Sequence, residues 1–228
     1  MYILIFLVFA GLGYLVNSRL KQKFKTYSQT PISSRMTGRE VAEKMLNDHG
    51  IYDVQVISTP GQLTDHYNPA NKTVNLSENV YHEENIAAAA VAAHECGHAV
   101  QHATAYNWLQ MRSKLVPIVG LSSKIMNIIF IFGFLGAFAF NFPYDIILLI
   151  IIAAQAFIAL FSIITLPVEY DASNRALKWL QTSGVAGHSE LEKANDALKW
   201  AARTYVVSAL AAVTTLLYYV LRYMGTRD

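Results

Sequence analysis

Cysteine is nearly absent from this sequence, because Cys96 is the only one in 228 residues. A single cysteine excludes an intrachain disulfide framework and a cysteine-rich zinc module. Charged residues are scarce too, at 15% of the chain, against about 25% in an average soluble protein. Hydrophobic residues make up 54%, which excludes a disordered chain. The net charge of +2 gives no electrostatic reason to expect a nucleic-acid partner.

The apolar residues are concentrated in four stretches without any charged residue: 2–16, 125–142, 146–166 and 205–221. A helix that crosses a bilayer needs about 20 apolar residues. The two middle stretches meet this length, and the last is close to its lower limit. The first is lengthened by Leu20 and by the aliphatic stems of its basic neighbours. We therefore expect a multi-pass protein with the lipid bilayer as its surroundings.

Basic residues predict the orientation of these spans. None precedes the first stretch, so it is an anchor and not a cleaved signal peptide. Four follow it at once: Arg19, Lys21, Lys23 and Lys25. The turn 141–145 has no Lys or Arg, and of the 18 basic residues only Arg222 and Arg227 would lie outside with it. Because basic loops stay in the cytoplasm, we expect the amino terminus outside and the soluble segments inside.

The polar part of the chain has the pattern of an α+β segment. Thr37 and Glu40 match a capping box at the start of a helix. Residues 52–58 alternate in polarity, and the runs 63–67 and 73–77 flank a turn-rich linker, which predicts a small antiparallel sheet. Asn85 then begins an alanine-rich helix that extends to about Ala105. The expected fold is mainly α (α+β).

These patterns divide the chain into five segments. The first, 1–18, is a transmembrane anchor, and 19–112 is a cytoplasmic segment that carries the alanine-rich helix. Residues 113–166 form a transmembrane hairpin. Residues 167–204 form a second cytoplasmic, helical segment, and 205–228 a final transmembrane helix.

The chemistry is concentrated in His94-Glu95-Cys96-Gly97-His98, an H-E-x-x-H motif. Residues four apart share one face of a helix, so the two imidazoles can bind one Zn²⁺. Glu95 is then placed to act as the general base toward a water on the metal. Cys96 lies on the far face, which favours packing over ligation. The alanine-rich run before the motif has high helix propensity, so the spacing is realised on a zincin-like helix.

A catalytic zinc usually has three protein ligands and one open position. His102 is close in sequence, but on a helix it lies about 12 Å along the axis from His94, too far to share one ion. It is a supporting or a surface residue. Glu169 follows the third apolar stretch and emerges on the same side as the motif. It is either the third ligand or an ordinary charge at the membrane boundary.

Four runs carry a resemblance to a known family: residues 63–69, 74–81, 92–99 and 169–173, which read LTDHYNP, VNLSENVY, AAHECGHA and EYDAS. They resemble the YugP-like zinc metallopeptidases of bacterial membranes, and the likeness covers most of the chain. It implies a zinc site of His94, His98 and Glu169, one Zn²⁺ per chain, and a bacterial cell membrane location. HtpX-type membrane metalloproteases are a more distant resemblance. They have Asp where Ser173 stands, so either Asp171 or Ser173 orients a histidine.

The expected function is a membrane-embedded zinc endopeptidase that cleaves a peptide or membrane-protein substrate at the cytoplasmic membrane face. The alternatives are an intramembrane protease and a non-catalytic zinc-containing scaffold. The sequence predicts no oligomeric state. Two further residues have an open role: His66 is structural or binds substrate, and Arg175 steadies an oxyanion or belongs to a solvated helix face.

Overall fold

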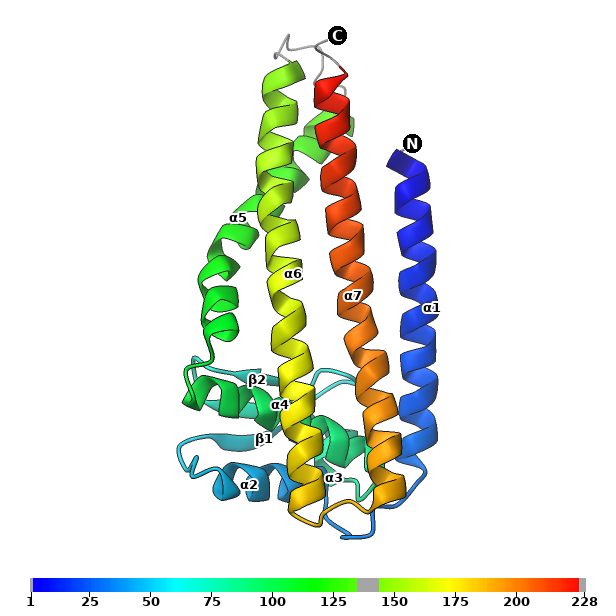
Figure 1. Cartoon of the computed structure of the whole chain (residues 1–228), viewed down its shortest axis with the longest axis vertical. Coiled ribbons are helices and arrows are strands. Elements are labelled where there is room, and N and C mark those ends of the chain that lie inside the picture. Colours follow the sequence, from blue (N-terminus) through cyan, green and yellow to red (C-terminus); the bar gives the residue numbers. More distant parts are fainter. Residues whose placement is uncertain (1, 135–143, 226–228) are drawn as a thin grey trace. The chain divides into compact units, whose positions relative to one another are not determined.

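The computed structural model describes residues 2–134 and 144–225, and over these ranges the chain forms seven helices and three short strands (Figure 1). The helices are α1 Tyr2–Ser28, α2 Gly38–Asp48, α3 Glu78–His82, α4 Ile86–Ala103, α5 Asn107–Phe134, α6 Tyr144–Thr182 and α7 His188–Met224. The strands are β1 Gln55–Thr59, β2 His66–Asn68 and β3 Thr73–Ser77. The expected mainly α fold with a small sheet is confirmed. The turn expected outside the membrane falls largely on residues 141–143, which lie outside the described residues.

The chain forms two compact units. Unit 1 consists of Met1–Tyr14, Gln110–Leu166 and Tyr205–Asp228. Unit 2 consists of Leu15–Leu109 and Pro167–Thr204. Every residue of the candidate site belongs to unit 2, so its geometry is described within that unit alone.

Unit 1 carries the apolar stretches. Four helices of the described chain, α1, α5, α6 and α7, are long and apolar enough to cross a membrane. Large apolar side chains such as Phe6 and Phe130 are exposed there, at 61% and 72%, as expected for surfaces that face lipid. Within this unit the buried Gln155 donates a 3.1 Å hydrogen bond from Nε2 to the carbonyl of Ala212, which links α6 to α7.

Unit 2 has a core of small and branched apolar side chains around α4. The alanines of α4 up to Ala99 are buried, and α4 packs against α2, α3 and the sheet. Asn85 caps α4, because its Oδ1 accepts the Ala88 backbone N–H at 2.9 Å. Alanine combines high helix propensity with a small side chain, so α4 is stable as a helix and its neighbours can approach closely.

The sheet is mixed, with the strand order β1-β3-β2. The β2–β3 pair is antiparallel, as the turn-rich linker predicts, but β1 pairs with β3 in parallel. The expectation of a wholly antiparallel sheet is therefore wrong for β1. The reason is the connection: residues 60–72 separate β1 from β3 and contain β2, which is long enough for a parallel crossover.

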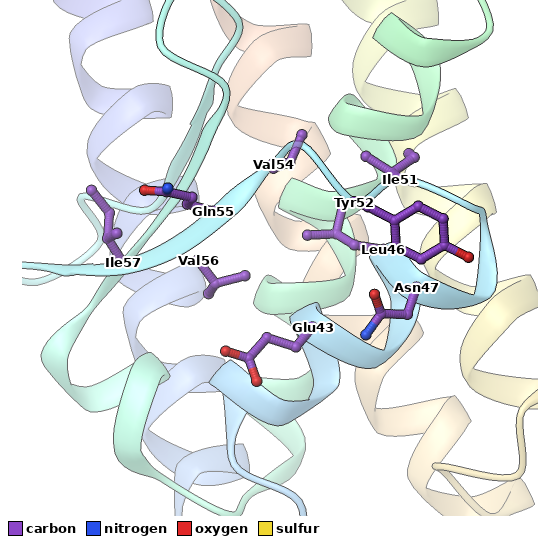
Figure 2. Close-up of a pocket in the computed structure, with 9 residues that line it drawn as sticks. All are labelled: Glu43, Leu46, Asn47, Ile51, Tyr52, Val54, Gln55, Val56 and Ile57. Atoms are coloured by element: carbon purple, nitrogen blue, oxygen red, sulfur yellow. The ribbon is translucent and has the colours of Figure 1, made fainter.

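The capping box at α2 is confirmed, because Thr37 and Glu40 exchange the two expected hydrogen bonds. Gly50 ends this helix with a φ of +71°, a conformation that glycine adopts without strain. Beyond that end, a shallow cavity of about 410 Å³ lies between α2 and β1, and Tyr52 and Val56 are among the side chains on its wall (Figure 2). The candidate metal group described below is not part of this cavity.

Candidate metal centre

Helix α4 places the two motif histidines one turn apart. His94 and His98 lie on the same face, and their rings meet edge to face with centroids 4.8 Å apart. His98 is buried and His94 is nearly so. The local sequence is sufficient for this arrangement, because the preceding alanines favour the helix and the spacing of four aligns the side chains.

Glu169 on α6 meets these histidines. Its Oε2 lies 3.4 Å from Nε2 of His94 and 3.6 Å from Nε2 of His98. One ligand atom from each of the three residues lies within 4.8 Å of the others. Two ligand atoms at about 2.0–2.1 Å from a tetrahedral zinc are separated by about 3.4 Å. The observed spacing and the donor set of two imidazoles and a carboxylate therefore fit a zinc ion.

Ser173 supports the first histidine. Its Oγ lies 3.1 Å from Nδ1 of His94, and it stands four residues after Glu169 on the same helix. Ligand and support thus project from one face of α6. A partner at Nδ1 leaves Nε2 of His94 to face Glu169.

Asp171 reaches the second histidine indirectly, through Gln101 of α4. Nδ1 of His98 lies 3.0 Å from Oε1 of Gln101, and Gln101 Nε2 donates to Asp171 at 2.8 Å. Both residues left open by the sequence therefore contact a histidine or its partner. Burial lowers the pKa of the His98 imidazole, but its interactions with nearby groups, chiefly the Glu169 carboxylate, together have the larger effect, so the pKa of His98 is raised.

Glu95 projects from the same helix but is not part of the three-residue metal group. Its Oε2 accepts the backbone N–H of Tyr67 at 3.0 Å, a bond from β2 to α4. Only 8% of Glu95 is exposed. This bond holds the carboxylate beside the motif histidines and leaves oxygen lone pairs for another proton donor.

The remaining sequence candidates lie outside the metal group. His66 is exposed on β2 and its Nδ1 lies 2.8 Å from the Thr64 carbonyl. His102 is exposed, and its Nδ1 lies 2.8 Å from the Tyr67 hydroxyl. Arg175 donates from Nε to Asp171 at 2.6 Å and lies over the Tyr106 ring.

Cys96 points away from the metal group and into the core. It is fully buried, and its Sγ donates to the carbonyl of Ala42 on α2 at 3.5 Å. Burial raises the pKa of this thiol well above its usual value. The thiolate that zinc would require is therefore disfavoured, which agrees with its expected packing role.

Gly97 allows α4 and α6 to approach each other at the metal group. A Cβ at this position would lie 2.6 Å from the Ala172 carbonyl oxygen, which is backbone and has little freedom to move. We expect Gly97→Ala to separate the helices, because overpacking costs about 1–3 kcal/mol of unfolding free energy. Zinc affinity should fall as well, since Glu169 and the histidines lie on opposite sides of this contact. Titration calorimetry and chemical denaturation measure the two effects.

Gly120 provides the matched control. It is also a helical glycine, in α5, but no atom lies within 4 Å of its added Cβ. Gly120→Ala should leave zinc affinity unchanged, and the better helix propensity of alanine should keep or raise stability. Equal zinc affinity in Gly97→Ala and wild type would contradict the close-packing argument.

Sequence reasoning missed two residues of this centre. Gln101 was detectable, because it is a polar residue three positions after His98, on the same side of the helix as that histidine. Tyr67 was not, because its backbone N–H, and not its side chain, contacts Glu95. A contact of that kind depends on the tertiary placement of β2.

Comparison with known proteins agrees with this geometry. Residues 2–224 match the model of a family described as "putative neutral zinc metallopeptidase". A curated relative, the "putative membrane protease YugP" of Bacillus subtilis (strain 168), is 39% identical over 226 residues and covers 98% of each chain. No solved structure matches the chain. With nearly its whole length matched and a zinc-compatible group at its motif, the chain belongs to the putative neutral zinc metallopeptidase family.

Proposed function

We propose that this protein is a membrane-embedded, zinc-dependent endopeptidase with its active site at the cytoplasmic membrane face. One observation carries the proposal: the Nε2 atoms of His94 and His98 and Oε2 of Glu169 converge at ligand spacing. Glu95 lies outside this group on the same helix, as a general base must. Membership of a zinc metallopeptidase family supports the same assignment.

His94, His98 and Glu169 would hold the ion as two neutral nitrogens and one carboxylate oxygen. When bound, zinc lowers the pKa of a coordinated water to about 7 and polarises a substrate carbonyl.

Glu95 would act as general base and then general acid. Its carboxylate takes a proton from the attacking water and passes it to the amine of the leaving peptide. The Tyr67 N–H donates to Oε2 of Glu95 at 3.0 Å. This bond restrains the Glu95 side chain and leaves carboxylate lone pairs that can accept the proton. The same bond ties the base to β2, an outer strand of the sheet.

A site at the membrane surface fits the helices better than one inside the bilayer. The described helices that could span are α1, α5, α6 and α7, and α4 with its motif is not among them. Because α4 does not reach the length and apolar composition of these helices, we favour a surface endopeptidase over intramembrane proteolysis.

The function is tested by hydrolysis of an unfolded polypeptide such as casein by the purified full-length protein in detergent. We expect cleavage that a zinc chelator abolishes and that added Zn²⁺ restores. Peptide mass spectrometry of the products should show internal cuts. Zinc binding without hydrolysis of any peptide or membrane-protein substrate would instead favour the scaffold alternative.

The orientation is a separate prediction that rests on the distribution of basic residues. A cysteine introduced at Asn141 should react with an impermeant thiol reagent added outside cells, whereas one at Thr182 should not. Cys96 gives little background, because it is fully buried and its pKa is raised. Labelling at Thr182 but not at Asn141 would place the site on the outer face.

A further inference from the structure

Gln101 is the most completely buried polar side chain near the metal group, with 0% exposed. A buried amide without hydrogen bonds destabilises a folded protein. Gln101 has partners for its polar atoms, because it contacts His98, Asp171 and the Val168 carbonyl. Two of these partners belong to α6, so the side chain connects the two helices that carry the candidate ligands.

The partners determine which way the amide points. Nε2 of Gln101 donates to the Val168 carbonyl and to Asp171 Oδ2, both at 2.8 Å. These two acceptors use both N–H groups, so Oε1 faces Nδ1 of His98 at 3.0 Å. Because Oε1 can only accept, Nδ1 of His98 must carry the proton. In the neutral imidazole the other ring nitrogen, Nε2, then carries the lone pair that a metal ion needs, and it lies 3.6 Å from Oε2 of Glu169.

Asp171 is itself held in place. Its Oδ2 accepts from Nε of Arg175 at 2.6 Å, and the Arg175 guanidinium lies 5.6 Å from the Tyr106 ring centroid. Arg175, Asp171, Gln101 and His98 therefore form one continuous line of contacts. A negative charge beyond the amide polarises the Gln101 carbonyl toward the His98 N–H.

We infer that Gln101 is a positioning residue that holds His98 in the metal-binding tautomer and links this ligand to the Asp171–Arg175 ion pair. The inference rests on the proposed zinc function. His94 has a different support, the Ser173 hydroxyl. Loss of Gln101 should therefore weaken the binding of zinc by His98 and leave His94 in place.

The test compares zinc dissociation constants, measured by competition with a chromophoric chelator on full-length protein in detergent. Gln101→Leu keeps the volume and removes both polar functions. We expect zinc binding to weaken by roughly 10–100-fold, the range for the loss of a group that orients a ligand. Gln155→Leu is the control, since Gln155 is also buried and donates to a backbone carbonyl. Its zinc affinity should equal that of wild type.

A second pair of variants separates positioning from packing. Gln101→Glu keeps shape and volume, but its carboxylate would face two acceptors, Asp171 and the Val168 carbonyl. We expect zinc binding to weaken here as well. Adding Asp171→Asn supplies a donor toward the new carboxylate and should recover most of the loss. Circular dichroism of the metal-free variants checks that each one folds.

Different outcomes identify different errors. Wild-type zinc affinity in Gln101→Leu would overturn the positioning role while leaving the proposed function intact. Wild-type zinc affinity in Gln101→Glu would overturn the link to Asp171, because a carboxylate can still accept the His98 Nδ1–H but cannot donate to Asp171. A wild-type protein that binds no zinc would overturn the proposed function, and this inference with it. Weakening in both single variants, with recovery in the double variant, is the result that supports positioning.

Discussion

Glu95→Gln is expected to keep the zinc and the fold and to lose roughly 10²–10⁴ in turnover, the usual contribution of a general base. Glutamine has nearly the same shape, and its amide oxygen can still accept the Tyr67 N–H that Glu95 accepts at 3.0 Å. It has no carboxylate to take a proton from water. Because Glu95 is not in the metal group, the substitution should leave zinc content near that of wild type.

Glu192→Gln is the matched control for this variant. Glu192 is a glutamate of unit 2 whose side chain is 73% exposed, beside His188 on α7. The same chemical change there should alter neither turnover nor zinc content. A Glu95→Gln protein with full activity that chelation still abolishes would show that another group takes the proton.

Glu169→Ala is expected to remove most of the bound metal. Glu169 supplies the single carboxylate oxygen of the group and is only 2% exposed. Its loss leaves two imidazoles and a cavity, so zinc affinity should fall by more than the roughly 10–100-fold range seen for outer supporting residues. The purified variant should contain far less than one zinc per chain by elemental analysis.

Cys96→Ala distinguishes ligand loss from general damage near the site. It alters the residue midway between His94 and His98, but its thiol points to Ala42 of α2. We expect full zinc occupancy, with at most a loss of stability from the small cavity. Full occupancy in Glu169→Ala would remove Glu169 from the ligand set.

The sequence was informative wherever the structure depends on local spacing. The alanine run and Asn85 predict α4, and a spacing of four places His94 and His98 on one face of that helix. The capping box at Thr37 predicts the start of α2 for the same reason. These features need only the residues within a few turns of each other.

It was less informative where the structure depends on contacts between distant segments. The parallel pairing of β1 with β3 follows from a crossover, which the alternating pattern does not encode. The contact of Gly97 with Ala172 requires the approach of α6. Glu169 was assigned through a family resemblance, because a carboxylate after an apolar stretch has several ordinary explanations.

The choice between Asp171 and Ser173 shows the same limit. From the sequence, only one of them was expected to orient a histidine. In the structure each residue is connected to a different histidine. Ser173 contacts His94 directly, and Asp171 is linked to His98 through Gln101. The link to His98 depends on the Gln101 side chain, which belongs to α4. The spacing of residues along α6 therefore does not predict it.

X-ray absorption at the zinc edge, on wild-type protein purified with its metal, tests the central claim most directly. The account predicts a first shell of about four nitrogen and oxygen atoms at about 2.0–2.1 Å, with the scattering pattern of two imidazoles and no sulfur near 2.3 Å. This result would mean two histidines, one carboxylate and one exchangeable position. A sulfur contribution, or a shell with three or more imidazoles, would contradict a site built from His94, His98 and Glu169.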